Sequence, residues 1–151
     1  MNDAQTTEKR LRILLADRSS EVLGLISNIL EPGFEIVAAV HDSQSLLAMD
    51  GTTEHDLLVA DILLPGINGV EQWKDIHRRN TSRKVLFLST CTERSYISAA
   101  FKAGASGYIL KTSALSELVN AIRAVVDGKP YVSPDLITLV RERSRKPIDI
   151  G

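Results

Sequence analysis

The stretch from residue 57 to residue 69 constrains the fold more than any other part of the sequence. Four apolar residues, 57 to 60, lead without alternation into the carboxylate of Asp61, and Pro65 and Gly66 break the pattern soon afterwards. Such a run is typical of a strand covered on both faces. Asp61 is therefore expected at the carboxyl end of a buried strand, where open α/β sheets bind ligands. Because an acid there can also cap a helix or start a turn, the other strands must decide between these interpretations.

The composition is that of one soluble globular domain. Of 151 residues, 44% are hydrophobic and 25% charged, and no apolar run approaches the roughly 20 residues that span a membrane. The polar residues 1 to 10 lack the apolar core of a secretory signal, and the single cysteine, Cys91, fits a reducing compartment. We therefore expect a cytoplasmic protein without a disulfide or a multi-cysteine metal site. The net charge of -1 gives no sign of direct nucleic-acid binding.

Strand and helix patterns alternate along the chain. Unalternating apolar runs predict strands, and apolar residues at helical spacing, with Gly or Pro after them, predict helices. We expect a doubly wound α/β fold in which a five-stranded parallel sheet carries helices on both faces. The predicted strands cover residues 11–16, 34–40, 57–61, 85–88 and 107–110, and the predicted helices cover residues 20–30, 42–50 (closed by Gly51), 70–79, 93–102 and 114–126.

The chain beyond the fifth helix has a helix signal and then a basic tail. Ser133 and Pro134 are a typical cap and first-turn pair. The basic residues from 141 onward are interpreted as a solvated tail. Apolar residues between these two features predict a short sixth helix: Leu136, Ile137, Leu139 and Val140.

Polar side chains follow four of the predicted strands at their carboxyl ends. They are Asp17, Asp61, Ser89 and Lys111. Each alone has an ordinary explanation as a cap, a turn residue or a surface charge, but the four share one edge of an apolar sheet. Together they suit phosphoryl transfer to Asp61, with a divalent cation held by the acids. Ser89 would donate to a phosphoryl oxygen, and Lys111 would neutralise its charge.

With these residues in view, the sequence from 11 to 127 resembles the receiver domain of two-component response regulators, whose fold CheY shares with flavodoxin. The most specific segments are residues 61–69, which are similar to the phosphoacceptor loop, and residues 102–111, which are similar to the last strand and its lysine. The resemblance implies that Asp61 accepts a phosphoryl group. It also implies that Ser89 and Tyr108 switch together in response.

The resemblance further implies a metal, partners and a domain plan. Mg²⁺ would be held by Asp17, Asp61 and the backbone carbonyl of Leu63. Residues 127–134 are similar to the connector of FixJ/NarL/LuxR-type regulators, which leads to a helix-turn-helix domain. The implied partners are a sensor histidine kinase, a second copy in a homodimer and DNA through an output domain absent from this chain; no membrane is implied.

The corresponding domain plan has three parts. Residues 1–10 form a polar tail, residues 11–128 the receiver, and residues 129–151 a linker helix and basic tail. The chain is either a fragment of a longer transcription regulator, which we favour, or a receiver that stands alone.

Arg18 departs from the family pattern. Receivers usually carry two acids after the first strand, and here the pair is Asp17 and Arg18. If Arg18 points inward, it weakens or abolishes Mg²⁺ binding, because a hard dication prefers carboxylate oxygens. Three arrangements are open: Arg18 points to solvent, forms an ion pair with Asp61, or takes over the neutralisation of the phosphate.

Three other functions are compatible with parts of the pattern. A degenerate receiver that Arg18 has made unphosphorylatable would act only in dimerisation or docking. A haloacid-dehalogenase-type phosphohydrolase needs an acid at the position of Leu63 to protonate a leaving group. A flavin-binding protein needs a phosphate-binding loop at residues 17–20, and none is evident.

Several chemically notable residues are expected to be structural. Trp73 lies at helical spacing with apolar neighbours and is predicted to pack in the core. The three histidines, His41, His55 and His77, are too scattered to predict a metal site. Cys91 has no neighbouring charge in the sequence that would indicate a redox role.

Overall fold

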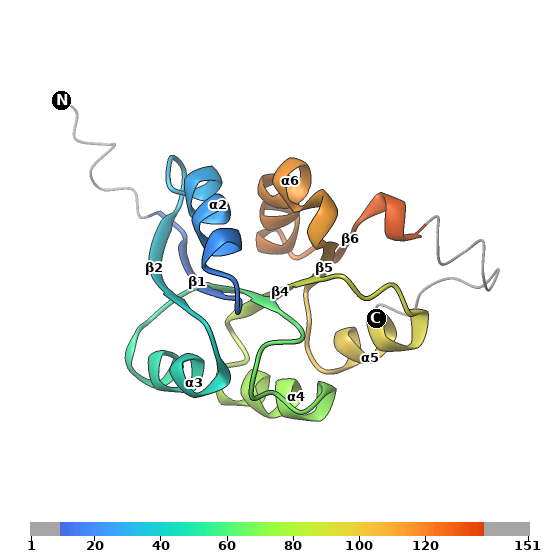
Figure 1. The fold of residues 1–151 in the computed structure, drawn as a ribbon, viewed down its shortest axis with the longest axis horizontal. Helices are drawn as coiled ribbons and strands as arrows, with labels where there is room; N and C mark the ends of the chain where they lie inside the picture. The colour runs from blue at the N-terminus through green and yellow to red at the C-terminus, as the bar shows by residue number, and fades with distance from the viewer. Residues whose placement is uncertain (1–9, 138–151) are drawn as a thin grey trace.

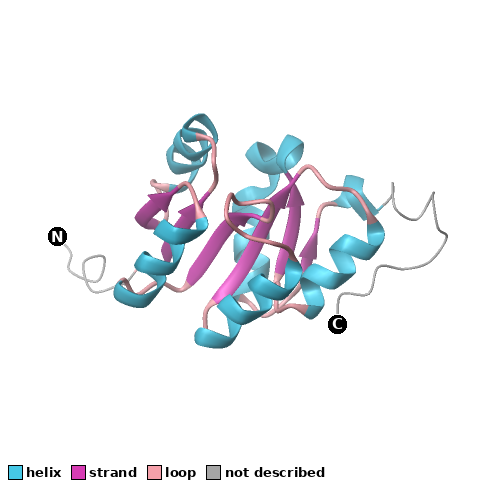
Figure 2. Ribbon diagram, turned by 60° about the horizontal axis from the view of Figure 1, so that its bottom comes forward, coloured by secondary structure: helices cyan, strands magenta, loops and turns pink. Residues whose placement is uncertain are grey.

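Six parallel strands form the centre of the structure, in the order β2-β1-β3-β4-β5-β6. Figure 2 shows the strands in magenta with helices around them. The structure is a computed structural model that describes residues 10 to 137. The strands are β1 (Arg12–Ala16), β2 (Glu35–Val40), β3 (Leu57–Asp61), β4 (Lys84–Ser89), β5 (Gly107–Leu110) and β6 (Tyr131–Val132). The helices are α2 (Ser20–Leu30), α3 (Ser43–Thr52), α4 (Val70–Arg79), α5 (Arg94–Lys102), the 3-10 turn η1 (Lys111–Ser113) and α6 (Ala114–Val126).

Helices cover both faces of the sheet, as the sequence predicts. Helices α2 and α6 lie on one face, and α3, α4 and α5 lie on the other (Figure 1). In β3, Leu57 and Val59 pack toward α2 and α6, whereas Leu58 and Ala60 pack toward the opposite face. Because both sets of side chains are buried, the strand has no reason to alternate apolar with polar residues.

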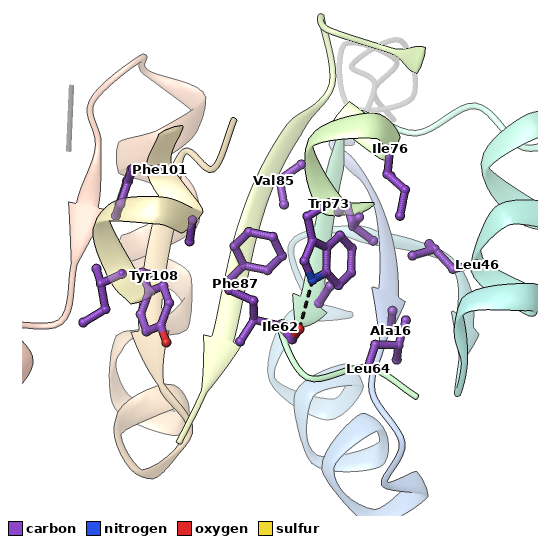
Figure 3. Packing of buried hydrophobic residues seen from close by; sticks show 14 of the residues in the cluster. Ala16, Leu46, Ile62, Leu64, Trp73, Ile76, Val85, Phe87, Phe101 and Tyr108 are labelled. Atoms are coloured by element: carbon purple, nitrogen blue, oxygen red, sulfur yellow. Dashed lines mark hydrogen bonds between the residues drawn. The ribbon is translucent and has the colours of Figure 1, made fainter. Parts of the chain in front are cut away.

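Trp73 lies in the core between α4 and the sheet, which confirms its predicted role. Its ring meets Phe87 edge to face, with the ring centroids 4.9 Å apart. Its indole nitrogen donates a 2.9 Å hydrogen bond to the carbonyl of Ile62 (Figure 3). That bond fixes the chain directly after Asp61, so the core of this face also supports the edge where the polar residues gather.

The structure adds a sixth strand to the five that the sequence predicts. Strand β6 pairs with β5 in parallel, Gly107 with Tyr131 and Tyr108 with Val132. Two residues are too few to show any periodicity, so no pattern in the sequence predicts this strand. Residues 134 to 137 are helical, as expected, but Leu139, Val140, the basic tail and residues 1–9 lie outside the described residues.

One helix-end prediction was wrong and one was confirmed in position, since Ser133 directly precedes the first helical residue, Pro134. Gly51 does not close α3, because the helix continues to Thr52 and the Thr53 N–H still bonds to the carbonyl of Met49. The side chain of Ser133 does not cap the following helix; its backbone carbonyl accepts from Leu136 and Ile137 instead. Among the described residues, no helix is long and apolar enough to cross a membrane.

A buried ionic cluster lies at the opposite edge of the sheet from the carboxyl ends of the strands. Arg83, just before β4, is fully buried and forms an ion pair with Asp50 of α3. His55, just before β3, lies with its Nε2 2.9 Å from the Arg83 guanidinium and 3.3 Å from Asp50. Arg83 thereby joins the start of β4 to α3 and to the start of β3, from which it is separated by 33 and 28 residues in sequence.

Replacing Asp50 with Asn should lower the free energy of unfolding by about 3 to 5 kcal/mol at neutral pH, because Arg83 then remains buried without a counter-ion. Burial alone raises the pKa of Asp50, but the hydrogen bond from His55 and the charge of Arg83 outweigh it and lower that pKa. The contribution of ionised Asp50 to the free energy of unfolding is therefore fully present above the unfolded-state pKa of about 3.9. It is lost as the pH falls through the lower folded-state pKa.

Urea denaturation at several pH values checks this, and the gap between wild type and Asp50→Asn should shrink below about pH 4. The matched control is Asp75→Asn, which removes a solvent-exposed pair with Arg78 and should cost less than about 0.5 kcal/mol. Equal losses at the two positions would contradict the role of the cluster.

Candidate functional site

Asp17, Asp61 and Lys111 meet at the carboxyl edge of the sheet. Strands β1 and β3 pair in register up to Ala16 and Ala60, so the two aspartates that follow emerge side by side. The Nζ of Lys111 lies 2.8 Å from Oδ2 of Asp17 and 2.8 Å from Oδ2 of Asp61. Asp17 is fully buried and Asp61 is only 4% exposed. The structure therefore brings together three of the four strand-end residues that the sequence singled out.

Each carboxylate is also fixed by its own loop. Oδ1 of Asp61 accepts a 2.8 Å hydrogen bond from the backbone N–H of Leu63. Oδ1 of Asp17 accepts a 2.9 Å bond from the N–H of Ser19, and the Ser19 hydroxyl caps α2 by accepting from Val22. These local bonds are the ones that aspartate makes two residues onward in turns. They orient the carboxylates so that each directs its second oxygen at Lys111.

The ammonium of Lys111 is held in its charged form. Burial lowers its pKa, but the adjacent carboxylates of Asp17 and Asp61 outweigh burial, so the pKa lies above its usual value. Its side chain is 21% exposed, so the site remains open to solvent from the side of this residue. The pocket therefore presents a permanent positive charge next to the Asp61 carboxylate, which suits a group that carries negative oxygens.

Ser89 and Tyr108 lie close to this pocket but contact a different partner. The hydroxyl of Ser89 accepts a 2.9 Å bond from the N–H of Cys91, and the hydroxyl of Tyr108 donates a 3.0 Å bond to the carbonyl of Cys91. Both residues are fully buried, and burial raises the pKa of Tyr108. Within residues 10 to 137, no hydrogen bond joins Ser89 to Asp61 or Lys111. No side-chain pattern predicts that Ser89 and Tyr108 both contact Cys91, because they bond to its backbone N–H and carbonyl.

Comparison with known proteins assigns the chain to a family. The family model described as the response regulator receiver domain matches residues 13–123. The chain belongs to the response regulator receiver domains. Receivers of this family are signalling domains rather than conventional enzymes, which removes the phosphohydrolase and flavin-binding interpretations.

The relatives of this receiver are transcription regulators. The transcriptional regulatory protein DegU of Brevibacillus brevis is 33% identical over 96% of this chain and 62% of its own length. A two-component response regulator of the LuxR family from Aurantimonas is 30% identical, with a TM-score of 0.81 over 92% of this chain and 100% of that one. A structure of two RcsB dimers bound to two parallel DNAs has the same fold, with 24% identity and a TM-score of 0.80 over 88% of this chain and 69% of that one. This receiver thus spans less than two thirds of the DegU relative.

Arg18 points away from the pocket of this receiver. Its side chain is exposed, and within the described residues no hydrogen bond or ion pair joins it to Asp17 or Asp61. Leu63, two residues after Asp61, is 52% exposed beside the pocket. Of the three arrangements open from the sequence, the structure has the one in which Arg18 faces solvent.

The receiver's carboxylates fit a divalent cation. Receiver domains generally bind Mg²⁺ at the phosphorylation site. Here Oδ2 of Asp17 is buried and accepts no hydrogen bond from the described residues, although Lys111 lies within ion-pair distance. Carboxylate oxygens are the ligands that Mg²⁺ prefers, with water completing its coordination. Among the described residues, no group of three or more His, Cys, Asp or Glu side chains is placed to hold a metal, so Asp17 and Asp61 would be its only carboxylate ligands.

Replacing Arg18 with Ala should leave the Mg²⁺ dissociation constant unchanged, because the guanidinium faces solvent. Arg18→Asp should lower that constant by about tenfold, the equivalent of about 1.4 kcal/mol, because it adds a third carboxylate. Fluorescence of Trp73 is a suitable readout, since its indole is bonded next to Asp61 through Ile62. Equal affinity of Arg18→Asp and wild type would argue that position 18 does not reach the ion, and tighter binding by Arg18→Ala would show that Arg18 does point inward in solution.

Proposed function

We propose that this receiver accepts a phosphoryl group on Asp61 from the phosphohistidine of a sensor histidine kinase. A carboxylate oxygen of Asp61 attacks phosphorus and forms a P–O bond as the P–N bond to the imidazole breaks. The electron pair of that bond stays on nitrogen, and the ring takes up one proton from water, so that neutral imidazole leaves. The observation that carries this proposal is the sharing of the Lys111 ammonium between Asp61 and Asp17. Attack by water later releases inorganic phosphate and restores Asp61.

The residues around Asp61 suit this transfer. Lys111 keeps its charge and neutralises a phosphoryl oxygen as negative charge accumulates. The N–H of Leu63 orients the carboxylate. Mg²⁺, when held by Asp17, Asp61 and the carbonyl of Leu63, supplies further positive charge for the phosphoryl oxygens. The exposed position of Arg18 supports this function over a degenerate receiver, in which Arg18 would be expected to occupy Asp61.

Ser89 and Tyr108 form the proposed switch. The hydroxyl of Ser89 accepts from the N–H of Cys91, so its proton is available to a phosphoryl oxygen on Asp61. Turning toward that oxygen would shift the bond with Cys91. The carbonyl of Cys91 accepts the hydrogen bond from Tyr108, so the change would reach the face formed by α5, β5 and α6. The two states need differ by only a few kcal/mol for one phosphoryl group to shift their populations.

The proposed output is control of transcription in the cytoplasm. The receiver (residues 11–128) would change a surface used for homodimerisation, and the linker (residues 129–151) would lead to a DNA-binding helix-turn-helix domain outside this chain. The relation to DegU supports this plan, and RcsB is a relative in fold that binds DNA as dimers.

Incubation with acetyl phosphate and Mg²⁺ should add one phosphoryl group to the full 151-residue chain, as read by intact mass. Asp61→Asn should abolish the gain, and Lys111→Ala should slow it by about a hundredfold, because one stabilising charge is lost. Asp75→Asn, which changes an exposed carboxylate, should match wild type. If folded wild-type protein gains no mass, or if the Asp61→Asn variant gains the same mass, the proposal fails.

A further inference from the structure

The chain after α6 is attached to the strand that leads to Lys111. Strand β6 lies along β5, and the hydroxyl of Tyr131 donates a 3.0 Å bond to Glu117 of α6. Leu136, in the helical turn after β6, is fully buried in the core on the face of the sheet that α3, α4 and α5 cover. The segment from 131 to 137 is therefore docked through backbone, polar and apolar contacts.

Ser133 occupies the junction of this segment with β5. It is polar, yet it is fully buried. Its backbone N–H donates a 3.1 Å bond to the carbonyl of Tyr108. Its hydroxyl oxygen accepts a 3.0 Å bond from the N–H of Leu110, the last residue of β5. Since the chain turns into a helix at this point, the hydroxyl takes the place that a further strand carbonyl would occupy in the ladder.

The same residue also starts the helical turn that follows. Its carbonyl accepts from the N–H groups of Leu136 and Ile137. Ser133 thus holds the end of β5 with its side chain and the outgoing helical turn with its backbone. A residue without a hydroxyl would leave the N–H of the half-buried Leu110 without this partner, which is costly.

Leu110 is followed directly by Lys111, whose ammonium is shared between Asp17 and Asp61. We propose that Ser133 is a positioning residue for Lys111, and that its bond to Leu110 couples the Asp61 pocket to the docked segment from 131 to 137. The part of this inference that concerns phosphate rests on the proposed function. Coupling of this kind is reciprocal. A ligand that moves Lys111 changes the strength of the hydrogen bond between Ser133 and Leu110, and a substitution at Ser133 changes the affinity of the pocket for that ligand.

The test compares the full chain with three serine variants. Ser133→Ala removes the acceptor, Ser133→Thr keeps a hydroxyl, and Ser116→Ala is the matched control, since Ser116 is an exposed serine of α6 that bonds only locally to Ser113. Beryllofluoride with Mg²⁺ serves as the phosphoryl analogue, and its binding is followed by Trp73 fluorescence.

We expect Ser133→Ala to weaken beryllofluoride binding by about fivefold, the lower end of typical coupling between sites. Ser133→Thr should bind close to the wild-type level, and Ser116→Ala should be unchanged. A purely structural role would lower the thermal midpoint of Ser133→Ala without changing this affinity. Wild-type affinity in Ser133→Ala, or equal weakening in Ser133→Thr, overturns the proposal.

A second readout does not depend on phosphorylation. Lys111 is protected from amine-labelling reagents by its two aspartate partners, whereas Lys129 is exposed and serves as the internal reference. Ser133→Ala should raise the labelling rate of Lys111 relative to Lys129 severalfold, and Ser133→Thr should restore it. If wild type fails to bind beryllofluoride but this rate changes, the proposed function fails and the coupling stands. An unchanged rate overturns the coupling.

Discussion

The carboxyl edge of the sheet depends on one ammonium group. Lys111 lies between Asp17 and Asp61, and both carboxylates are almost completely removed from water. Two buried negative charges repel each other and lack hydration, so the cation that lies between them offsets both costs. The arrangement holds only while the ends of β1, β3 and β5 stay in place. A new charge on Asp61 acts directly on this balance, which makes it an effective point of control.

The sheet around this edge resists displacement. Its central strands are buried on both faces, so a slip of one residue would exchange the side chains that face the two helical layers. At the opposite edge, the Arg83 cluster with Asp50 and His55 joins α3 to the starts of β3 and β4. Because the strands are fixed at both ends, a change in charge at the pocket is expected to move the loops that follow the strands and to alter the hydrogen bonds of those loops.

Two sets of contacts lie beside the pocket, and both involve β5. One runs from Ser89 through the backbone of Cys91 to Tyr108. The other runs from Lys111 through Leu110 to Ser133. Since Ser133 also bonds to the carbonyl of Tyr108, the two connections meet at the same strand. Strand β5 is therefore the element through which the proposed switch residues and the segment from 131 to 137 would respond to the pocket.

The sequence by itself determined the layered fold and the place of the pocket. Unbroken apolar runs required strands covered on both faces, and parallel strands bring their carboxyl ends to one edge, so Asp17, Asp61 and Lys111 had to lie near one another. Helix α6 and helix α4 have the predicted bounds because apolar spacing and glycine or polar ends mark them. These features follow from side-chain pattern alone.

Only the tertiary structure decided which groups touch. The outward direction of Arg18, the shared bond of Ser89 and Tyr108 to Cys91, strand β6 and the acceptor role of Ser133 have no sequence signature. The last three depend on backbone N–H and carbonyl groups, which almost every residue carries, and on contacts between segments far apart in the chain. The direction of Arg18 depends on which cation lies between the two aspartates. That cation is Lys111, which is far from Arg18 in the sequence and reaches the aspartates only in the folded chain.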